Sequence, residues 1–280
     1  MFYALRYCEI DMDAVHKKLK QLKDQVQEYG SAAVAFSGGV DSTFLLKVCH
    51  DVLGDKCVAI TVRSFMFSKR EIVDASSFCE MEGIRQLNVD TDESFINAFS
   101  DNPPNRCYIC KRALFELMIR AAKTEGISVL CEGSNVDDLG DYRPGLKAIS
   151  ELGIKSPLRD CGLVKSEIRA LSSELGLATA NKPSFACLAS RFPYGQKITA
   201  KSLNLVERAE DFLRDSGFGQ ARVRIHGDMA RIEVDPNAFT MAVEMCSRIV
   251  EAFKSFGFSY VALDLQGYRT GSMNEPLLVK

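Results

Sequence analysis

A glycine-rich turn between two apolar segments is the part of the sequence with the clearest chemical meaning. Residues 31–36 form a short apolar run, Ser37–Ser42 reads SGGVDS, and an amphipathic pattern continues to about Leu53. Two glycines allow a tight turn and a close approach to a ligand. The start of the following helix would present unpaired amides with partial positive charge, which is a cradle for phosphate. The alternative is a plain glycine turn whose helix is capped by Asp41.

Asp41 adds a second chemical function to this turn. A carboxylate repels phosphate, but it binds Mg²⁺, and Mg²⁺ bridges phosphate oxygens. The chain contains no G-x-x-x-x-G-K-[ST] string, which excludes a Walker-type nucleotide site. We therefore expect a nucleotide site of another class, in which Asp41 holds Mg²⁺.

Three of the ten cysteines lie in polar, irregular surroundings. Cys107 and Cys110 form a C-x-x-C at an expected helix start, and Cys187 lies in a separate irregular stretch. Structural zinc sites have four ligands, and no fourth cysteine or histidine stands at a suitable spacing. A [4Fe–4S] cluster on three thiolates would instead leave one iron open to carry sulfide. A redox pair and a set of inert thiols are the alternatives.

Most of the other cysteines are expected to be packing residues. They stand in apolar or periodic segments, where a thiol behaves as a small hydrophobic group; these are Cys49, Cys57, Cys79, Cys131 and Cys246. Disulfides are not expected in a reducing compartment.

The segments that must position these residues alternate between helix and strand. Helices are predicted over 11–29, 43–53, 68–82 and 107–125, and strands over 31–36, 57–62, 84–89 and 127–132. The strands are continuous apolar runs, which predicts an α/β fold with a parallel sheet covered on both faces. Ligands of such sheets bind beyond the carboxyl ends of the strands.

The second half of the chain follows a different pattern. Residues 134–164 and 178–198 are irregular, with a helix predicted between them over 165–176. Beyond them we expect a small α+β unit, with helices over 199–216 and 237–256 and strands over 221–225, 231–235 and 259–265. The sequence therefore predicts a nucleotide-binding domain over residues 1–196 and a smaller substrate or oligomerisation domain over residues 197–280.

Two arginines lie on the first strand of this smaller unit. Arg222 and Arg224 are two residues apart, so they share one face of the strand. Guanidinium groups fit phosphate oxygens, and a solvated strand face is the alternative. Glu210, on the preceding helix, is a candidate metal ligand or a surface acid.

The composition limits the partners of the chain. The 280 residues are 46% hydrophobic and 26% charged, as in soluble globular proteins, and the net charge is −2. That charge argues against a broad basic surface for DNA, RNA or an anionic membrane. No apolar run approaches the ~20 residues that span a bilayer, and residues 1–9 lack the order of a signal peptide. We expect a cytoplasmic protein with neither DNA nor membrane as a partner.

The SGGVDS string resembles the PP-loop of the ATP pyrophosphatases, a superfamily that includes GMP synthetase, NAD synthetase, argininosuccinate synthetase and thiolation enzymes. The resemblance implies cleavage of ATP between its α and β phosphates and transfer of AMP to an acceptor. It also implies that Ser64 and Gly133 lie near adenosine. The residues implied to bind ATP and Mg²⁺ in the loop are Ser37, Gly38, Gly39, Val40, Asp41 and Ser42.

Four further strings, at 106–111, 132–135, 141–145 and 187–195, resemble one family in their order and content. It is the LarE-like pyridinium-3,5-biscarboxylate mononucleotide sulfur synthases of nickel-pincer cofactor biosynthesis, and the resemblance covers about residues 30–275. It implies that a pyridinium carboxylate of a mononucleotide is adenylated and that sulfur is then inserted to give a thiocarboxylate. It also implies a homo-oligomer.

The same resemblance implies roles for single residues. Cys187 matches the cysteine that bears the sulfur. Some members sacrifice that sulfur and keep dehydroalanine, whereas others hold a [4Fe–4S] cluster with exchangeable sulfide on three cysteines. Cys107 and Cys110 place this chain with the cluster type. The residues implied to bind the substrate phosphate are Ser190, Arg191, Arg222 and Arg224.

Three other functions remain as alternatives. A tRNA thiolase would need a basic surface for tRNA, and the net charge of −2 argues against one. An amide-forming ATP pyrophosphatase would need an ammonia source and has no use for three loop cysteines. A non-catalytic nucleotide-binding regulator would carry structural zinc.

Overall fold

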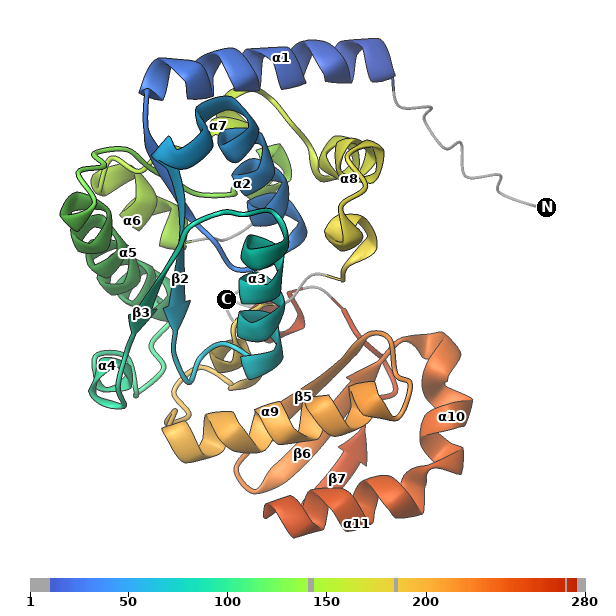
Figure 1. Ribbon diagram of the computed structural model, residues 1–280. Helices are drawn as coiled ribbons and strands as arrows, with labels where there is room; N and C mark the ends of the chain where they lie inside the picture. Colours follow the sequence, from blue (N-terminus) through green and yellow to red (C-terminus); the bar gives the residue numbers. More distant parts are fainter. Residues whose placement is uncertain (1–10, 141–143, 184–185, 270, 276–280) are drawn as a thin grey trace. The chain divides into compact units, whose positions relative to one another are not determined.

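A computed structural model describes residues 11–140, 144–183, 186–269 and 271–275 (Figure 1). The chain divides into two compact units, each built from separate stretches of sequence. The first unit comprises 1–62, 71–89 and 111–184, and the second comprises 63–70, 90–110 and 185–280. Within the described part of the chain, no helix is both long and apolar enough to cross a membrane.

The first unit is built on a four-stranded sheet in the order β3-β2-β1-β4. The strands are β1 (Ala32–Ala35), β2 (Cys57–Arg63), β3 (Gln86–Asp90) and β4 (Leu130–Cys131), and β1 pairs in parallel with both β2 and β4. The predicted α/β fold with a parallel sheet is therefore confirmed. The strand order reverses between β1 and β4, and ligands of open α/β sheets bind beyond the strand ends at such a point.

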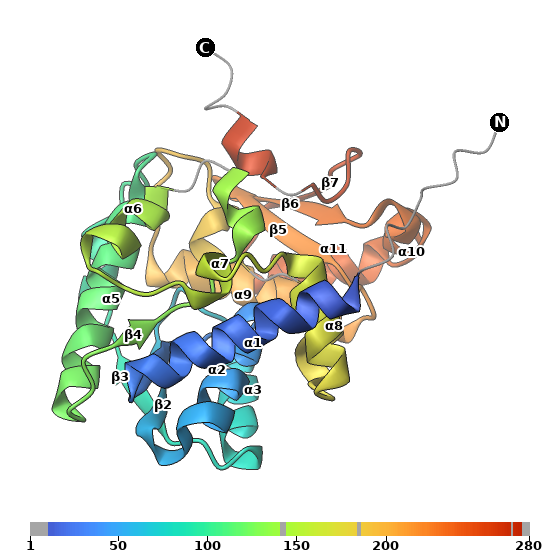
Figure 2. The same ribbon diagram turned by 90° about the horizontal axis from the view of Figure 1, so that it is seen from above.

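Helices cover both faces of this sheet (Figure 1). Successive strand residues point to opposite faces, so that Val34 packs with one layer of helices and Ala33 with the other. The first layer contains α1 (Met12–Tyr29), α2 (Val40–Leu53), α3 (Lys69–Met81), α7 (Pro157–Asp160) and α8 (Lys165–Glu174). The second contains α6 (Pro144–Glu151) and residues 111–124 of α5 (Arg106–Thr124), whose first residues belong to the second unit. Figure 2 shows α1 running beside α2, and an ion pair between Lys18 and Glu167 ties α1 to α8.

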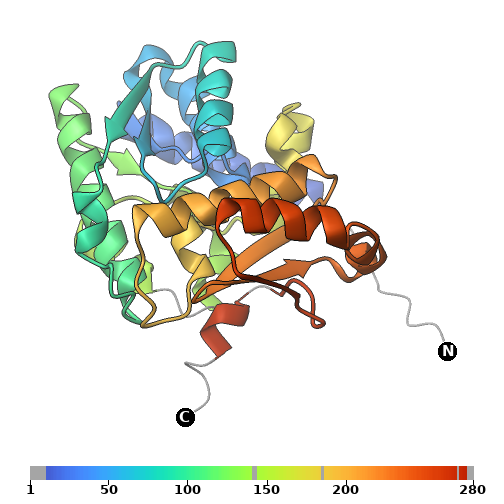
Figure 3. The ribbon, with the colours of Figure 1, turned by 90° about the horizontal axis from the view of Figure 1, so that it is seen from below.

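The second unit contains a three-stranded sheet in the order β5-β6-β7. An antiparallel hairpin joins β5 (Ala221–His226) to β6 (Met229–Val234), and β7 (Tyr260–Leu263) lies parallel to β6. Gly227 has a φ of 64° in the hairpin turn, a conformation that favours glycine. Its helices are α4 (Ser94–Asn97), α9 (Ala200–Asp215), α10 (Phe239–Glu244) and α11 (Cys246–Phe256). In Figure 3, α9 and α11 lie side by side over the sheet, and Phe212 and Phe253 meet edge to face between them.

Three details differ from the sequence predictions. The helix expected over 237–256 is two helices separated at Met245, and the helical spacing of Ala242, Ile249 and Phe253 continues across the break, so the pattern does not show it. The strand expected over 127–132 is reduced to Leu130–Cys131. Cys246 is exposed and is not a packing residue.

The compact units also do not coincide with a single boundary near residue 197. Two loops, after β2 and β3, join the second unit because the stretch around Cys187 bonds to their backbones. The amide of Leu188 donates to the carbonyl of Met66 at 2.8 Å, and the amide of Ile198 donates to that of Ser100 at 2.7 Å. Contacts between segments so far apart leave no trace in local sequence patterns.

Candidate functional site

The predicted phosphate loop joins β1 to α2 in the first unit. Gly38 has a φ of 69°, and a Cβ added there would lie 3.3 Å from both the Ala75 Cβ and the Glu71 carbonyl oxygen. This position therefore requires glycine for its conformation and for its packing on α3. Gly39 is the N-cap of α2 and offers no capping side chain, so the first amides of the helix face the loop without one. Such amides attract an anion.

Gly133 follows β4 and lies against the start of α2. A Cβ at this position would come within 3.0 Å of the Ser42 nitrogen and 3.2 Å of the Asp41 carbonyl carbon. Only glycine allows this approach without a shift of the backbone. The loop after β1 and the loop after β4 therefore meet at the point where the strand order reverses.

The Asp41 carboxylate is held from two sides in the first turn of α2. Lys165 Nζ lies 2.6 Å from Asp41 Oδ2, and Asn135 Nδ2 donates to Asp41 Oδ1 at 3.3 Å. The Asp41 side chain keeps 23% of its surface exposed. The Asp41 carboxylate is therefore paired with an ammonium group beside the loop, and its role as a Mg²⁺ ligand stays a prediction.

A second lysine reaches the loop itself. Lys182 Nζ donates to the carbonyl oxygen of Gly38 at 3.1 Å and forms ion pairs with Glu71 at 3.1 Å and Asp74 at 3.0 Å. Neither Lys165 nor Lys182 was identified from the sequence. The available signal was weak, because Lys165 only begins a predicted helix and Lys182 only opens a Pro-containing loop.

The three candidate sulfur residues all belong to the second unit. Cys107 and Cys110 lie in the first turn of α5, and Cys187 is the N-cap of the short helix η4 (Leu188–Arg191). Nine cysteines are described and none of them forms a disulfide. No group of three or more His, Cys, Asp or Glu side chains is arranged to hold a metal ion within the described ranges. The structure thus brings the three cysteines into one unit without forming a ready-made ion site.

A buried polar bridge connects the C-x-x-C turn to the Cys187 loop. Arg106 donates from Nη1 to the Ala189 carbonyl at 2.9 Å and to the Asn102 side-chain oxygen. Asn102 is fully buried and donates to the Pro193 carbonyl at 2.6 Å. Arg106 immediately precedes Cys107, and Ala189 lies two residues after Cys187. The bridge was not predicted, although both of its side chains stand in the stretch that leads into the C-x-x-C.

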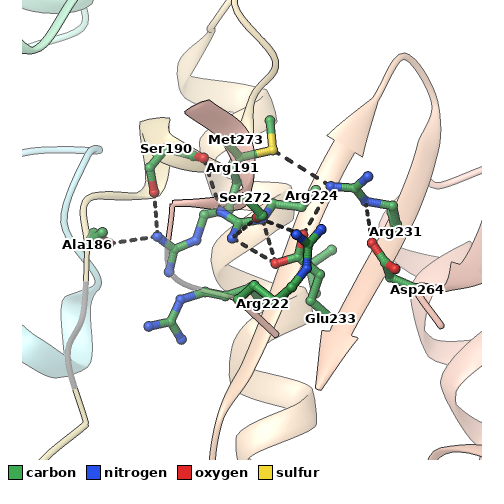
Figure 4. Close-up of polar contacts among 12 residues, drawn as sticks. Ala186, Ser190, Arg191, Arg222, Arg224, Arg231, Glu233, Asp264, Ser272 and Met273 are labelled. Carbon is green, nitrogen blue, oxygen red and sulfur yellow. Dashed lines mark hydrogen bonds and ion pairs between the residues drawn. The ribbon is translucent and has the colours of Figure 1, made fainter. Parts of the chain in front are cut away.

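The four predicted phosphate-binding residues lie together in the second unit (Figure 4). Arg191 is fully buried, donates to Ser190 Oγ at 2.7 Å, and forms a two-pronged ion pair with Glu210 at 2.8 and 2.9 Å. Arg224 binds Glu233 at 2.7 Å and the Ser190 carbonyl at 3.1 Å. Arg222 lies over the Tyr268 ring, 5.3 Å from its centre.

Burial rules out two interpretations that the sequence left open: a solvated strand face for the arginines and a surface position for Glu210. Arg222 and Arg224 are only 3% and 5% exposed, so their strand face is not solvated. Glu210 is 7% exposed, so it is not a surface acid. Burial raises its pKa, but the charge and hydrogen bonds of Arg191, together with the charge of Arg222 and the amide of Val223, outweigh that effect and hold the pKa below its usual value. Glu210 is therefore an ionised partner of Arg191.

Among the residues that the structure describes, this cluster contains more buried guanidinium groups than buried carboxylates. Arg191, Arg222 and Arg224 face the buried carboxylates Glu210 and Glu233. Burial, and after it the charge of Arg191, lowers the pKa of Arg222 to about 10. An anion beside these guanidinium groups would offset this excess.

Two predicted features belong to another unit or lie partly outside the described residues. Ser64 is buried in the second unit, where its carbonyl accepts from the Phe67 amide at 3.1 Å, whereas Gly133 belongs to the first unit. The string at 141–145 is described only from residue 144 onward.

Comparison with known proteins gives consistent results across the chain. The NAD synthase family matches residues 14–156. An uncharacterized protein of Synechocystis sp. is 42% identical over 265 residues, which cover 94% of this chain and 99% of that protein. The pyridinium-3,5-bisthiocarboxylic acid mononucleotide synthase of Lactiplantibacillus plantarum is 36% identical over 267 residues, covering 95% of this chain and 97% of that enzyme. The glutamine-hydrolyzing GMP synthase of Chlamydia muridarum is 26% identical over 216 residues, covering 70% of this chain and 40% of that enzyme.

Proposed function

The chain belongs to the NAD synthase family and, within it, to the group of the pyridinium-3,5-bisthiocarboxylic acid mononucleotide synthases, and we propose that it converts carboxylates of a pyridinium mononucleotide into thiocarboxylates. It is an ATP-dependent sulfurtransferase, and we propose that it acts in nickel-pincer cofactor biosynthesis. One observation supports the proposal most directly. The phosphate loop lies where the strand order of the sheet reverses, and Gly133 packs closely against the start of α2.

The first step is adenylation of the carboxylate. A carboxylate oxygen attacks the α-phosphorus of ATP, pyrophosphate leaves, and an acyl-adenylate forms, which replaces a poor leaving group by AMP. The amides at the start of α2 stabilise the charge that develops on the phosphates. Asp41 would hold Mg²⁺ here, and that ion would neutralise part of the charge of the departing pyrophosphate.

The second step transfers sulfur. A sulfide attacks the carbonyl carbon of the acyl-adenylate, AMP leaves, and a thiocarboxylate remains. We propose that Cys107, Cys110 and Cys187 would hold a [4Fe–4S] cluster, and that this group would supply the sulfide. The proposal is supported by three thiols from two segments of one unit and by the bridge of Asn102 and Arg106 between those segments.

The substrate phosphate is assigned to the arginine cluster of the second unit. Ser190, which is half-buried, supplies a hydroxyl, and the buried Arg191, Arg222 and Arg224 supply three guanidinium groups beside it. Guanidinium groups bind phosphate oxygens in pairs of parallel hydrogen bonds. Membership of the family also leads us to propose a homo-oligomer, which sedimentation would test.

The test of this function uses the purified chain with ATP, Mg²⁺, sulfide and the pyridinium-3,5-biscarboxylate mononucleotide. We expect pyrophosphate release that depends on the pyridinium substrate, and a product whose mass shows oxygen replaced by sulfur. Pyrophosphate release with ammonia and an amide product would overturn the proposal in favour of an amide-forming enzyme. Release with tRNA as the only acceptor would overturn it in favour of a tRNA thiolase.

The sulfur source is tested on protein purified without oxygen. About four irons per chain, lost in Cys107→Ala, are expected for the cluster. Absence of iron, together with a loss of ~34 Da at Cys187 after one turnover, would instead show conversion of that cysteine to dehydroalanine.

A further inference from the structure

The peptide group between Gly38 and Gly39 is the part of the phosphate loop whose orientation the sequence restricts least. Neither residue has a Cβ, so rotation of this peptide meets little steric resistance. A trans peptide points its carbonyl and its N–H in opposite directions. Rotation by half a turn would replace the Gly39 N–H by the Gly38 carbonyl oxygen, which repels phosphate. A loop of this sequence therefore needs a group that fixes the peptide.

Lys182 is placed to supply that group. Its ammonium donates to the Gly38 carbonyl oxygen at 3.1 Å, and its side chain is only 15% exposed. Because the carbonyl is held by Lys182, the N–H of Gly39 points away from that lysine. Gly39 is the N-cap of α2, next to the amides that form the phosphate cradle.

The lysine is itself held from two directions in the first unit. On α3, Glu71 and Asp74 bind its ammonium at 3.1 and 3.0 Å. On α8, Arg169 Nη2 donates to the Lys182 carbonyl at 2.9 Å, and Nη1 donates to the Ala180 carbonyl. Residues of α3 therefore hold the side-chain ammonium of Lys182, and a residue of α8 holds its backbone.

We propose that Lys182 is a positioning residue for adenylation, which orients the Gly38–Gly39 peptide so that the Gly39 N–H faces the phosphates of ATP. Arg169 holds the backbone of that lysine. Glu71 and Asp74 more than balance the charge of the ammonium, which disfavours a direct contact between Lys182 and phosphate. The inference rests on the proposed function only in taking ATP as the ligand.

The test compares the binding of two ligands by calorimetry on the full chain: a non-hydrolysable α,β-methylene analogue of ATP with Mg²⁺, and adenosine, which has no phosphates. Lys182→Met keeps the aliphatic stem and removes the donors, and we expect its affinity for the analogue to fall about tenfold, as loss of one charge-assisted hydrogen bond produces. Its affinity for adenosine should be unchanged. Lys182→Arg retains a cationic donor and should recover most of the affinity for the analogue.

A matched control is available on α2. Lys47 also forms ion pairs with two acids, Asp51 and Glu82, and Lys47→Met should bind both ligands as the wild type does. If Lys182→Met does not fold, Arg169→Met gives a second test, with a smaller loss that is again confined to the analogue. Unchanged binding of the analogue, or an equal loss of adenosine, would overturn the positioning role.

The test of Lys182 and the test of the proposed function can fail independently. A wild type that binds the analogue but releases no pyrophosphate with the pyridinium substrate would refute the function and leave the Lys182 test valid. A wild type that binds neither ligand would refute the nucleotide site, and with it the role of Lys182.

Discussion

The ammonium of Lys165 lies 2.6 Å from the carboxylate of Asp41, beside the first turn of α2. Asn135 binds the other carboxylate oxygen, so the side chain is held in one orientation by groups from two further segments of the first unit. An acid at a helix start is favoured by the helix dipole, and here it also attracts a cation to the edge of the phosphate loop. We propose that the same carboxylate receives Mg²⁺ when ATP is bound.

Asp41→Asn should reduce pyrophosphate release by about 100-fold or more, because the metal loses its protein ligand while the shape of the side chain is kept. The control is Asp51→Asn at the far end of the same helix, where the acid is 38% exposed and pairs with Lys47. Initial rates of pyrophosphate release at saturating Mg²⁺ provide the measurement. A rate within twofold of the wild type would remove Asp41 from the metal role.

Gly133→Ala should disturb the phosphate loop from the side of β4. The new methyl group would lie 3.0 Å from the Ser42 nitrogen, so the backbone has to shift, at a cost of about 1–3 kcal/mol. Urea unfolding measures this loss of stability, and calorimetry with the ATP analogue measures the weaker binding. Gly219→Ala is the control, because a Cβ there meets no atom within 4 Å. Equal stability of the two variants would contradict the close approach.

The phosphate loop could be predicted from the sequence because its signals are local. A buried strand, two glycines and a helix start stand within about twenty residues, and each restricts the backbone by itself. The lysines that complete the site could not be predicted in this way. Lys165 is 124 residues from Asp41, and Lys182 is 144 residues from Gly38, so neither contact leaves a periodic pattern.

The arginine site shows a second limit of sequence patterns. The spacing of Arg222 and Arg224 correctly puts them on one strand face, but spacing carries no information on whether that face is buried. Burial follows from α9 packing on the sheet and from Glu210 and Glu233, which lie on α9 and β6. The partner carboxylates are therefore what distinguishes a buried ion-pair cluster from a solvated strand.

Arg224→Met should lower the affinity for the pyridinium nucleotide and also the stability of the fold. Glu233 is 1% exposed in its side chain and would keep its ion pair with Arg231, at 3.0 Å, so the loss should stay below the ~3–5 kcal/mol of a fully unpaired buried charge. The double variant Arg224→Met with Glu233→Gln should recover most of that stability, yet keep a KM for the pyridinium nucleotide raised about tenfold and an unchanged KM for ATP. Steady-state kinetics of the double variant separate the two effects. A wild-type KM for both substrates would refute the phosphate clamp.

Arg106→Gln should lower iron loading although all three cysteines remain. The change shortens the buried bridge that ties the C-x-x-C turn to the Cys187 loop, so the two segments lose their fixed separation. Iron and acid-labile sulfide, measured after anaerobic purification, should fall well below the wild-type content. The control is Arg112→Gln on the same helix, whose side chain is 50% exposed. Full iron content in Arg106→Gln would show that the bridge does not support the cluster.

The ion pair of Arg191 with Glu210 should make stability depend on pH in the acid range. The pKa of Glu210 in the folded chain lies below its ordinary value of 4.5, because Arg191, Arg222 and the Val223 amide together outweigh the opposing effect of burial. A depressed pKa means that the pair stabilises the fold fully above pH 4.5 and that this contribution is lost as the pH falls through the folded pKa.

Glu210→Gln should therefore be destabilised near pH 7, by about 3–5 kcal/mol for a buried Arg191 that has lost its charged partner. The difference from the wild type should shrink as the pH falls below 4.5. Urea unfolding of both proteins, between pH 7 and the lowest pH at which they fold, measures the free energy of unfolding as a function of pH. Glu244→Gln, at an exposed position on α10, serves as the control. Parallel curves for the wild type and Glu210→Gln would mean that Glu210 does not titrate with the fold, and the anion site would then have to be neutralised by other groups.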